Sequence, residues 1–191
     1  METTSSRIKI LDNSNLPAQS VEILNSVDKQ LGFVPNVLRL LAASPSVLKS
    51  FLGLQAGLSG TLDLNTRNAI ALAVSESNSC HYCVSAHAHF AAKGANCSQD
   101  EISRNRVGES IDPKRAAAAA FGVSVIKRRG NVSNADLEKI REAGYSDVEI
   151  LEIIALAVQF SFTNFMNNVA QTEIDFPKVD APAGITEQLV A

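Results

Sequence analysis

Signals for the start of a helix recur along this chain and limit it to a helical fold. Ser44 and Asp112 are each followed by proline, so a good N-cap residue precedes the residue favoured at the first helical position. Apolar residues then recur three and four positions apart, which is the period of an amphipathic helix. No segment alternates β-branched and polar residues, and no Asn-Gly turn separates two such segments. The sequence therefore predicts an all-α protein.

The same signals predict where the helices lie. Ser20 is expected to cap the first helix, and the pairs Ser98 with Glu101 and Ser146 with Glu149 have the spacing of a capping box. The predicted helices cover approximately residues 20–31, 36–43, 45–58, 70–77, 80–94, 98–108, 113–130 and 146–171.

The organisation of the chain predicts one domain. We find no internal repeat, and the one linker-like segment begins at Pro177. Residues 1–191 are therefore predicted to form a single domain, with 1–18 and 177–191 as terminal segments. The last segment is expected to lie along the surface or against a neighbouring subunit.

Composition and charge narrow the class of protein. Apolar residues make up 46% of the chain and charged residues 19%, a globular balance, and the net charge of -3 provides no broad positive field for nucleic acid. Residues 1–12 lack the pattern of a secretory signal. The apolar stretches around 116–126 and 150–162 are too short to span a membrane or are interrupted by Glu152. We expect a cytoplasmic protein without nucleic-acid or membrane partners.

The strongest chemical signal is a pair of cysteines, Cys80 and Cys83, followed by His87. Residues three and four apart are neighbours on a helix, so the three side chains are expected to form one stripe. Asn78 or Ser79 is expected to cap this helix. A thiol in the first turn faces free N–H groups and the positive end of the helix dipole, which favour the thiolate. The pair can also close a local disulfide.

Two other interpretations of the cysteines stay open at this point. Both thiols could pack in the core as small apolar residues. They could also bind zinc, with His87 and one of His81, His89 or Cys97 as further ligands, although a structural zinc site usually takes its second pair of ligands from a separate segment. A covalent haem is excluded because Val84, and not histidine, follows the second cysteine. We expect no cofactor and no metal.

The sequence around the cysteines, LAVSESNSCHYCVSAH at 72–87, resembles the carboxymuconolactone decarboxylase superfamily in its alkylhydroperoxidase AhpD-like branch. The segments LGFVPNVLRLLAASPSVLKSF and GYSDVEILEIIALAVQFSFTNFMNNVAQTEIDFP also resemble peroxidase-related members of that branch. The resemblance covers most of the chain. It implies an all-helical AhpD-like bundle that assembles as a homo-oligomer, commonly through trimers.

The resemblance also implies a function and a role for each site residue. Cys83 is expected to attack a hydroperoxide, Cys80 to resolve the product into a disulfide, and His87 to relay the proton. An external thiol or lipoyl-type reductant would then reopen the disulfide. The alternatives are a disulfide reductase acting on a lipoyl or protein partner, and a non-enzymatic protein that binds zinc or serves in assembly.

One position departs from the family pattern. The family has a glutamate twelve residues before the first cysteine, where this chain has Asn68. Glu76 is the candidate to supply the missing carboxylate, and its other interpretation is a solvated residue at a helix end. Amides at Asn164, Asn167 and Asn168 lie on the predicted last helix, where they could bind a neighbouring segment or line a pocket; no catalytic role is assigned to them.

Overall fold

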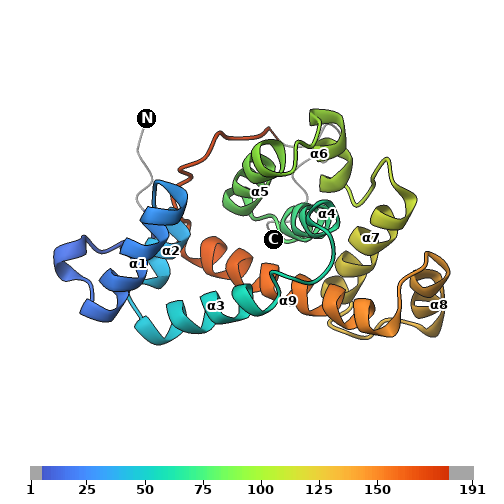
Figure 1. The fold of residues 1–191 in the computed structure, drawn as a ribbon, viewed down its shortest axis with the longest axis horizontal. Coiled ribbons are helices and arrows are strands. Elements are labelled where there is room, and N and C mark those ends of the chain that lie inside the picture. Colours follow the sequence, from blue (N-terminus) through green and yellow to red (C-terminus); the bar gives the residue numbers. More distant parts are fainter. Residues whose placement is uncertain (1–5, 181–191) are drawn as a thin grey trace.

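The computed structural model describes residues 6–180, and helices make up all the regular structure in that range (Figure 1). The prediction of an all-α fold is confirmed. A single 3-10 turn, η1, covers Asn13–Asn15. The helices are α1 (Ala18–Leu31), α2 (Asn36–Leu41), α3 (Pro45–Gly57), α4 (Leu64–Ser77), α5 (His81–Gly94), α6 (Gln99–Arg106), α7 (Pro113–Lys127), α8 (Asn134–Glu142) and α9 (Asp147–Ala170).

Most of the predicted helix starts are correct. Ser44 and Asp112 accept hydrogen bonds from the first turns of α3 and α7, and Ser146 forms a complete capping box with Glu149 at the start of α9. The predicted cap at Ser20 is wrong. Because Pro17 occupies the N-cap position of α1, Ser20 lies inside the first turn and is fully buried.

Two further details differ from the sequence analysis. Ser98 caps α6, but the Glu101 carboxylate binds Ser110, Ile111 and Arg115 instead of closing a capping box. Helix α8 was not predicted, although it begins with a capping box between Ser133 and Asp136. Its one fully buried residue is an isoleucine, so it lacks a long apolar stripe.

Helices α4, α7 and α9 build the main core, with α4 at the centre of the contacts. Small residues let α4 and α7 approach closely, since Ala69, Ala73 and Ala119 pack together and Gly122 lies against Ile70. A second apolar cluster joins α1, α2 and α3 to Phe162 and Met166 in the C-terminal half of α9. Helix α9 crosses the molecule between these two groups (Figure 1). It therefore positions both sides of the fold.

Among the described helices, α9 is long and apolar enough to cross a membrane, with a mean hydropathy of 1.4 over an 18-residue window. The helix is longer than the apolar run at 150–162, because it continues on both sides through more polar residues. Half of that window is buried inside the protein. The outward face exposes Leu151, Val158, Phe165 and Val169.

After α9 the chain turns back toward α5 (Figure 1). Phe176 packs against Tyr82, and Val179 packs beside the cluster formed by α4, α5 and α6. The expectation that the last segment lies along the surface can be followed as far as residue 180, and residues 181–191 lie outside the described range. The single-domain assignment of 1–191 stays a prediction.

The α4–α7 contact can be tested at Gly122. A Cβ atom there would lie 3.3 Å from Ile70 Cγ2 and 3.7 Å from the Ala157 Cβ. We expect Gly122→Leu to lower the free energy of unfolding by about 1–3 kcal/mol, because a larger side chain overpacks the contact. Gly53 in α3 has no atom within 4 Å of its added Cβ. Gly53→Leu should leave stability equal or raise it by up to ~1 kcal/mol through helix propensity. Equal losses in urea unfolding would contradict this packing.

Candidate active site

The candidate site is built at the turn between α4 and α5. Ser79 takes a left-handed conformation with φ of 53°, and its N–H donates to the Glu76 carbonyl. The next N–H, from Cys80, donates to the carbonyl of Ser75 at 2.9 Å. Together these bonds form a Schellman motif, which ends α4 and reverses the chain within a few residues. The first cysteine therefore stands at the point where α5 begins.

Cys80 is itself the N-cap of α5. Its sulfur accepts a hydrogen bond from the Cys83 N–H at 3.4 Å, so the predicted cap at Asn78 or Ser79 is wrong. The two sulfur atoms lie 2.7 Å apart, and the side chains are almost wholly buried, at 1% and 3% exposure. The expected contact within the pair is therefore present in the structure.

The two thiols differ in their acidity. Burial alone would raise the pKa of Cys83, but hydrogen bonds from Cys80, Asn164, Asn167 and Thr163 outweigh burial and lower it below its ordinary value. The pKa of Cys80 is raised well above its ordinary value, because this thiol donates to Cys83 and is also buried. Within the pair the thiolate form is therefore favoured at Cys83, to which the Cys80 thiol donates a hydrogen bond.

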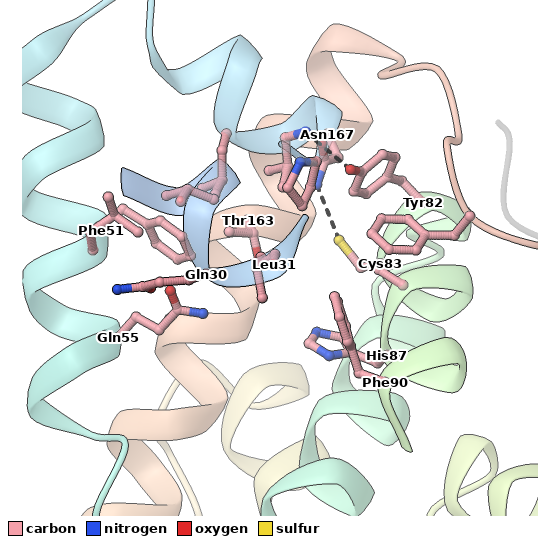
Figure 2. Close-up of a pocket in the computed structure, with 17 residues that line it drawn as sticks. Gln30, Leu31, Phe51, Gln55, Tyr82, Cys83, His87, Phe90, Thr163 and Asn167 are labelled. Carbon is pink, nitrogen blue, oxygen red and sulfur yellow. Dashed lines mark hydrogen bonds between the residues drawn. The ribbon is translucent and has the colours of Figure 1, made fainter. Parts of the chain in front are cut away.

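Amides from α9 hold this arrangement in place. Asn167 Nδ2 donates to the Cys83 sulfur at 3.2 Å (Figure 2). Asn164 accepts from Asn78 at 2.9 Å and donates to Ser75 Oγ at 3.1 Å, while Asn168 Nδ2 donates to the Asn78 carbonyl at 2.8 Å. These asparagines were expected to bind a neighbouring segment or line a pocket, without a catalytic role. Their grouping near the end of a strongly apolar helix is the sequence feature that could have identified them as site residues.

His87 lies one helical turn beyond Cys83, as predicted. Its ring packs edge-on against Phe160, with the centroids 5.1 Å apart. Burial lowers the pKa of His87 to about 4, so the imidazole is neutral near pH 7. Figure 2 shows the Cys83 sulfur and the His87 ring on the same side of α5, facing one pocket. A neutral imidazole in this position can accept a proton.

The pocket has a volume of about 400 Å³. It lies between α5 and the helices α1, α2 and α3, with α9 behind it (Figure 2). Leu31, Leu38, Phe51 and Phe90 are typical of its lining, which contains no Asp, Glu, Lys or Arg. Cys83 lines this pocket and Cys80 does not. An apolar molecule can therefore reach Cys83 and not its partner.

Glu76 and Asn68 are placed differently from the two thiols. The Glu76 carboxylate forms an ion pair with Arg106 Nε at 2.8 Å and does not line the pocket. Asn68 is buried in α4, and its side-chain nitrogen has no hydrogen-bond partner among the described residues. Glu76 therefore forms a salt bridge between α4 and α6. Among the described residues its carboxylate is paired with Arg106 and not with His87.

The other candidate zinc ligands contact different parts of the protein. His89 packs on Phe90 and Phe176, and Cys97 contacts Asn65 at 3.4 Å. Within residues 6–180, no group of three or more His, Cys, Asp or Glu side chains is placed to hold a metal ion. The described geometry gives the zinc interpretation no support.

Fold and site together define an all-helical protein with a buried thiol pair at a helix start. Residues 45–106 match the sequence profile of the carboxymuconolactone decarboxylase family, a region that runs from α3 to α6. This match and the solved structures described below support the assignment of the chain to this superfamily, in its AhpD-like group, as the sequence motifs indicated. The family match and the shared fold support a peroxidase-related function in the broad sense.

Solved structures support this assignment. A peroxidase-related protein from Ralstonia eutropha JMP134, with an alkylhydroperoxidase AhpD core, is 28% identical over 91% of this chain and 94% of its own, with a TM-score of 0.81. A peroxidase-related protein from Silicibacter sp. TM1040 is 23% identical over 91% and 95%, with a TM-score of 0.77. The debrominase Bmp8 shares the fold at 21% identity over 92% and 94%, with a TM-score of 0.71. No curated protein matches the chain.

The hydrogen bond from Asn167 to Cys83 predicts a change in acidity. We expect Asn167→Ala to raise the pKa of Cys83 by about one to two units, because a hydrogen bond to a charged group is worth about 1.5–3 kcal/mol. Thiolate absorbance against pH measures it, with Cys97→Ser present in all samples to remove the third thiol. Asn168→Ala is the matched control, since this amide binds a backbone carbonyl. Equal shifts in both variants would contradict the assignment.

The neutral, partly buried His87 predicts a pH dependence of stability. Its pKa is about 4 in the folded protein and ordinarily 6.5, so the unfolded chain binds the extra proton between these values. Stability contributed by neutral His87 is complete above pH 6.5 and is lost as the pH falls toward 4. Between pH 7 and pH 5 we expect a loss of about 2 kcal/mol in unfolding free energy that His87→Gln does not show. Parallel pH profiles of the two proteins in urea unfolding would disprove a buried neutral imidazole.

Proposed function

We propose that the protein is a thiol-dependent peroxidase that reduces organic hydroperoxides through Cys83 and Cys80. The observation that carries this proposal is the difference between the two thiols. Cys83 faces an apolar pocket and is favoured as the thiolate. The Cys80 sulfur lies 2.7 Å from the Cys83 sulfur, and the Cys80 thiol keeps its own proton. This is the arrangement required for one attacking and one resolving thiol.

In the first step the Cys83 thiolate attacks the terminal oxygen of the hydroperoxide. A sulfur–oxygen bond forms, the oxygen–oxygen bond breaks, and the sulfur becomes a sulfenic acid while the peroxide is reduced to an alcohol. His87, neutral and one turn away, takes the proton of any protonated Cys83 and returns it to the departing alkoxide. The donors around the sulfur stabilise the thiolate before attack.

In the second step the Cys80 sulfur attacks the sulfenic acid, and water leaves. The product is the Cys80–Cys83 disulfide, whose bond length of about 2.05 Å is within a small side-chain rotation of the observed separation. Two electrons have then passed from the thiol pair to the peroxide. An external thiol must supply them for the next cycle.

The lining of the pocket favours an apolar peroxide. It consists mainly of aliphatic and aromatic side chains, and Gln30 and Gln55 are polar residues on its exposed side. Hydrogen peroxide would gain little from such a lining, whereas an alkyl or aryl group would bury apolar surface in it. The family neighbour with an AhpD core, from Ralstonia eutropha, is described as peroxidase-related, which supports this direction.

The homo-oligomeric state and the cytoplasmic location are expectations from the sequence that belong to this proposal. The alternative function is a disulfide reductase that acts on a lipoyl or protein partner. Glu76 is not given a role in the proton transfer, because its carboxylate binds Arg106. Comparing turnover of cumene hydroperoxide with turnover of lipoamide separates the peroxidase from the reductase.

The two cysteines should give different results when each is replaced. We expect Cys83→Ser to abolish reduction of cumene hydroperoxide, and Cys80→Ser to allow a single turnover that stops at the sulfenic acid. Mass spectrometry after dimedone labelling detects that acid on Cys83 in the second variant. Cys97→Ser is the control and should behave as the wild type, because Cys97 lies away from the pocket. Peroxide turnover by Cys83→Ser at the wild-type rate would rule the proposal out.

A further inference from the structure

A second pocket lies on the other side of the wall that bounds the apolar pocket. Tyr82 and Asn167 line both. The second pocket has a volume of about 600 Å³, and its lining includes Ser79 and His81, the two residues that flank Cys80 in the chain. The thiol pair therefore has an apolar pocket at Cys83 and a polar one beside Cys80.

Two buried polar atoms belong to residues that line this polar pocket. Asn167 Oδ1 and Thr172 Oγ1 have no hydrogen-bond partner among residues 6–180, and their residues are only 3% and 6% exposed. Buried polar groups are normally paired. Since Asn167 Nδ2 is bound to the Cys83 sulfur, its oxygen is on the far side of the amide. Both residues line the polar pocket, so their unpaired atoms lie in its wall.

The rim of the polar pocket carries groups of both charges. Glu173 and Lys178 line it together with the exposed His81. The wall toward the apolar pocket is fixed, because the Tyr82 hydroxyl accepts from the Val37 N–H at 3.1 Å. A ligand with both ammonium and carboxylate groups matches this rim better than an apolar or uncharged one.

We infer that the polar pocket binds the reducing substrate, a small hydrophilic thiol that carries both ammonium and carboxylate groups. This inference rests on the proposed function, since it concerns the return half of the same cycle. The thiolate of the ligand attacks the Cys80 sulfur of the disulfide, the sulfur–sulfur bond breaks, and Cys83 leaves as a thiolate. A second molecule of thiol then attacks the ligand sulfur and releases Cys80, which takes up a proton. Two thiols are oxidised to one disulfide.

The direction of attack follows from the positions of the two sulfurs. In thiol exchange the nucleophile approaches along the sulfur–sulfur axis, opposite to the leaving sulfur. Cys83 is the better leaving group, because donors from α9 stabilise its thiolate. Attack must then come from the Cys80 side, and the two residues that flank Cys80 in the chain line the polar pocket. Ile174 both lines this pocket and packs against the cluster that contains Cys80, so it joins the pocket wall to the thiol pair.

The test isolates the reducing half of the cycle. The disulfide is formed with diamide, so its formation does not depend on reaction with peroxide, and the oxidation of the reduced protein by cumene hydroperoxide is measured separately. Reduction is then timed with glutathione, which carries both charges, and with 2-mercaptoethanol, which carries none, at equal thiolate concentrations. Alkylation and mass spectrometry count the recovered thiols.

Variants at the polar pocket should affect only the charged thiol. We expect Thr172→Val and Lys178→Glu to slow reduction by glutathione about five- to tenfold, while reduction by 2-mercaptoethanol changes less than about twofold. Thr172→Ser, which keeps the hydroxyl, should retain the wild-type rate. Oxidation by peroxide should stay the same in all of them.

Either of two results would overturn the inference. One is a glutathione rate that none of the variants changes, and the other is an equal slowing of both thiols. Faster reduction by dihydrolipoamide, unaffected by the same variants, would also overturn it and place the reductant elsewhere. A normal reducing half without peroxide oxidation would contradict the proposed peroxidase and leave the polar pocket supported.

Discussion

The hydrogen bonds between the α9 amides and the α4–α5 turn are the constraint on which the site depends. Asn164 and Asn168 hold the turn through Asn78 and Ser75, and Asn167 binds the Cys83 sulfur itself. A helix that supplies core contacts thus also sets the acidity of a thiol. Because hydrogen bonds are stronger in a buried site than in water, these amides can outweigh the cost of burying a thiolate. Packing and reactivity are therefore coupled through α9.

The same arrangement separates the two sides of the thiol pair. Cys83 faces apolar side chains from α1, α2 and α3. The residues that flank Cys80 line the polar pocket, together with residues of the segment after α9. The wall between them contains Tyr82 and Asn167, each held by a hydrogen bond. Oxidant and reductant of different polarity can then approach different sulfurs. This division makes chemical sense of a pair in which one thiol is acidic and the other is not.

Much of the fold could be predicted because its signals are local. N-caps such as Ser44 and Asp112 act on N–H groups two or three residues away, so the sequence alone identifies them. Where a cap residue has a competing partner, local rules fail: Glu101 binds Arg115 and residues of the next loop. Helix α8 was missed although its capping box, Ser133 with Asp136, is a local signal of the same kind. Glu76 was chosen because its position before the cysteines resembles the peroxidase-related pattern, which carries no information on Arg106, the residue of another helix that binds its carboxylate.

The sequence by itself determined the helical class and the resemblance to the family. It also determined the stripe of Cys80, Cys83 and His87, because residues three and four apart meet on any helix. Only the tertiary structure decided which sulfur faces a pocket, which amides donate to it, and how burial changes the acidity of His87. Those properties depend on α9, which follows the cysteines by more than sixty residues. Helical periodicity identifies α5 and α9 as helices, but it does not specify which residues of α9 lie against α5. Contacts between such distant segments therefore cannot be derived from the sequence pattern.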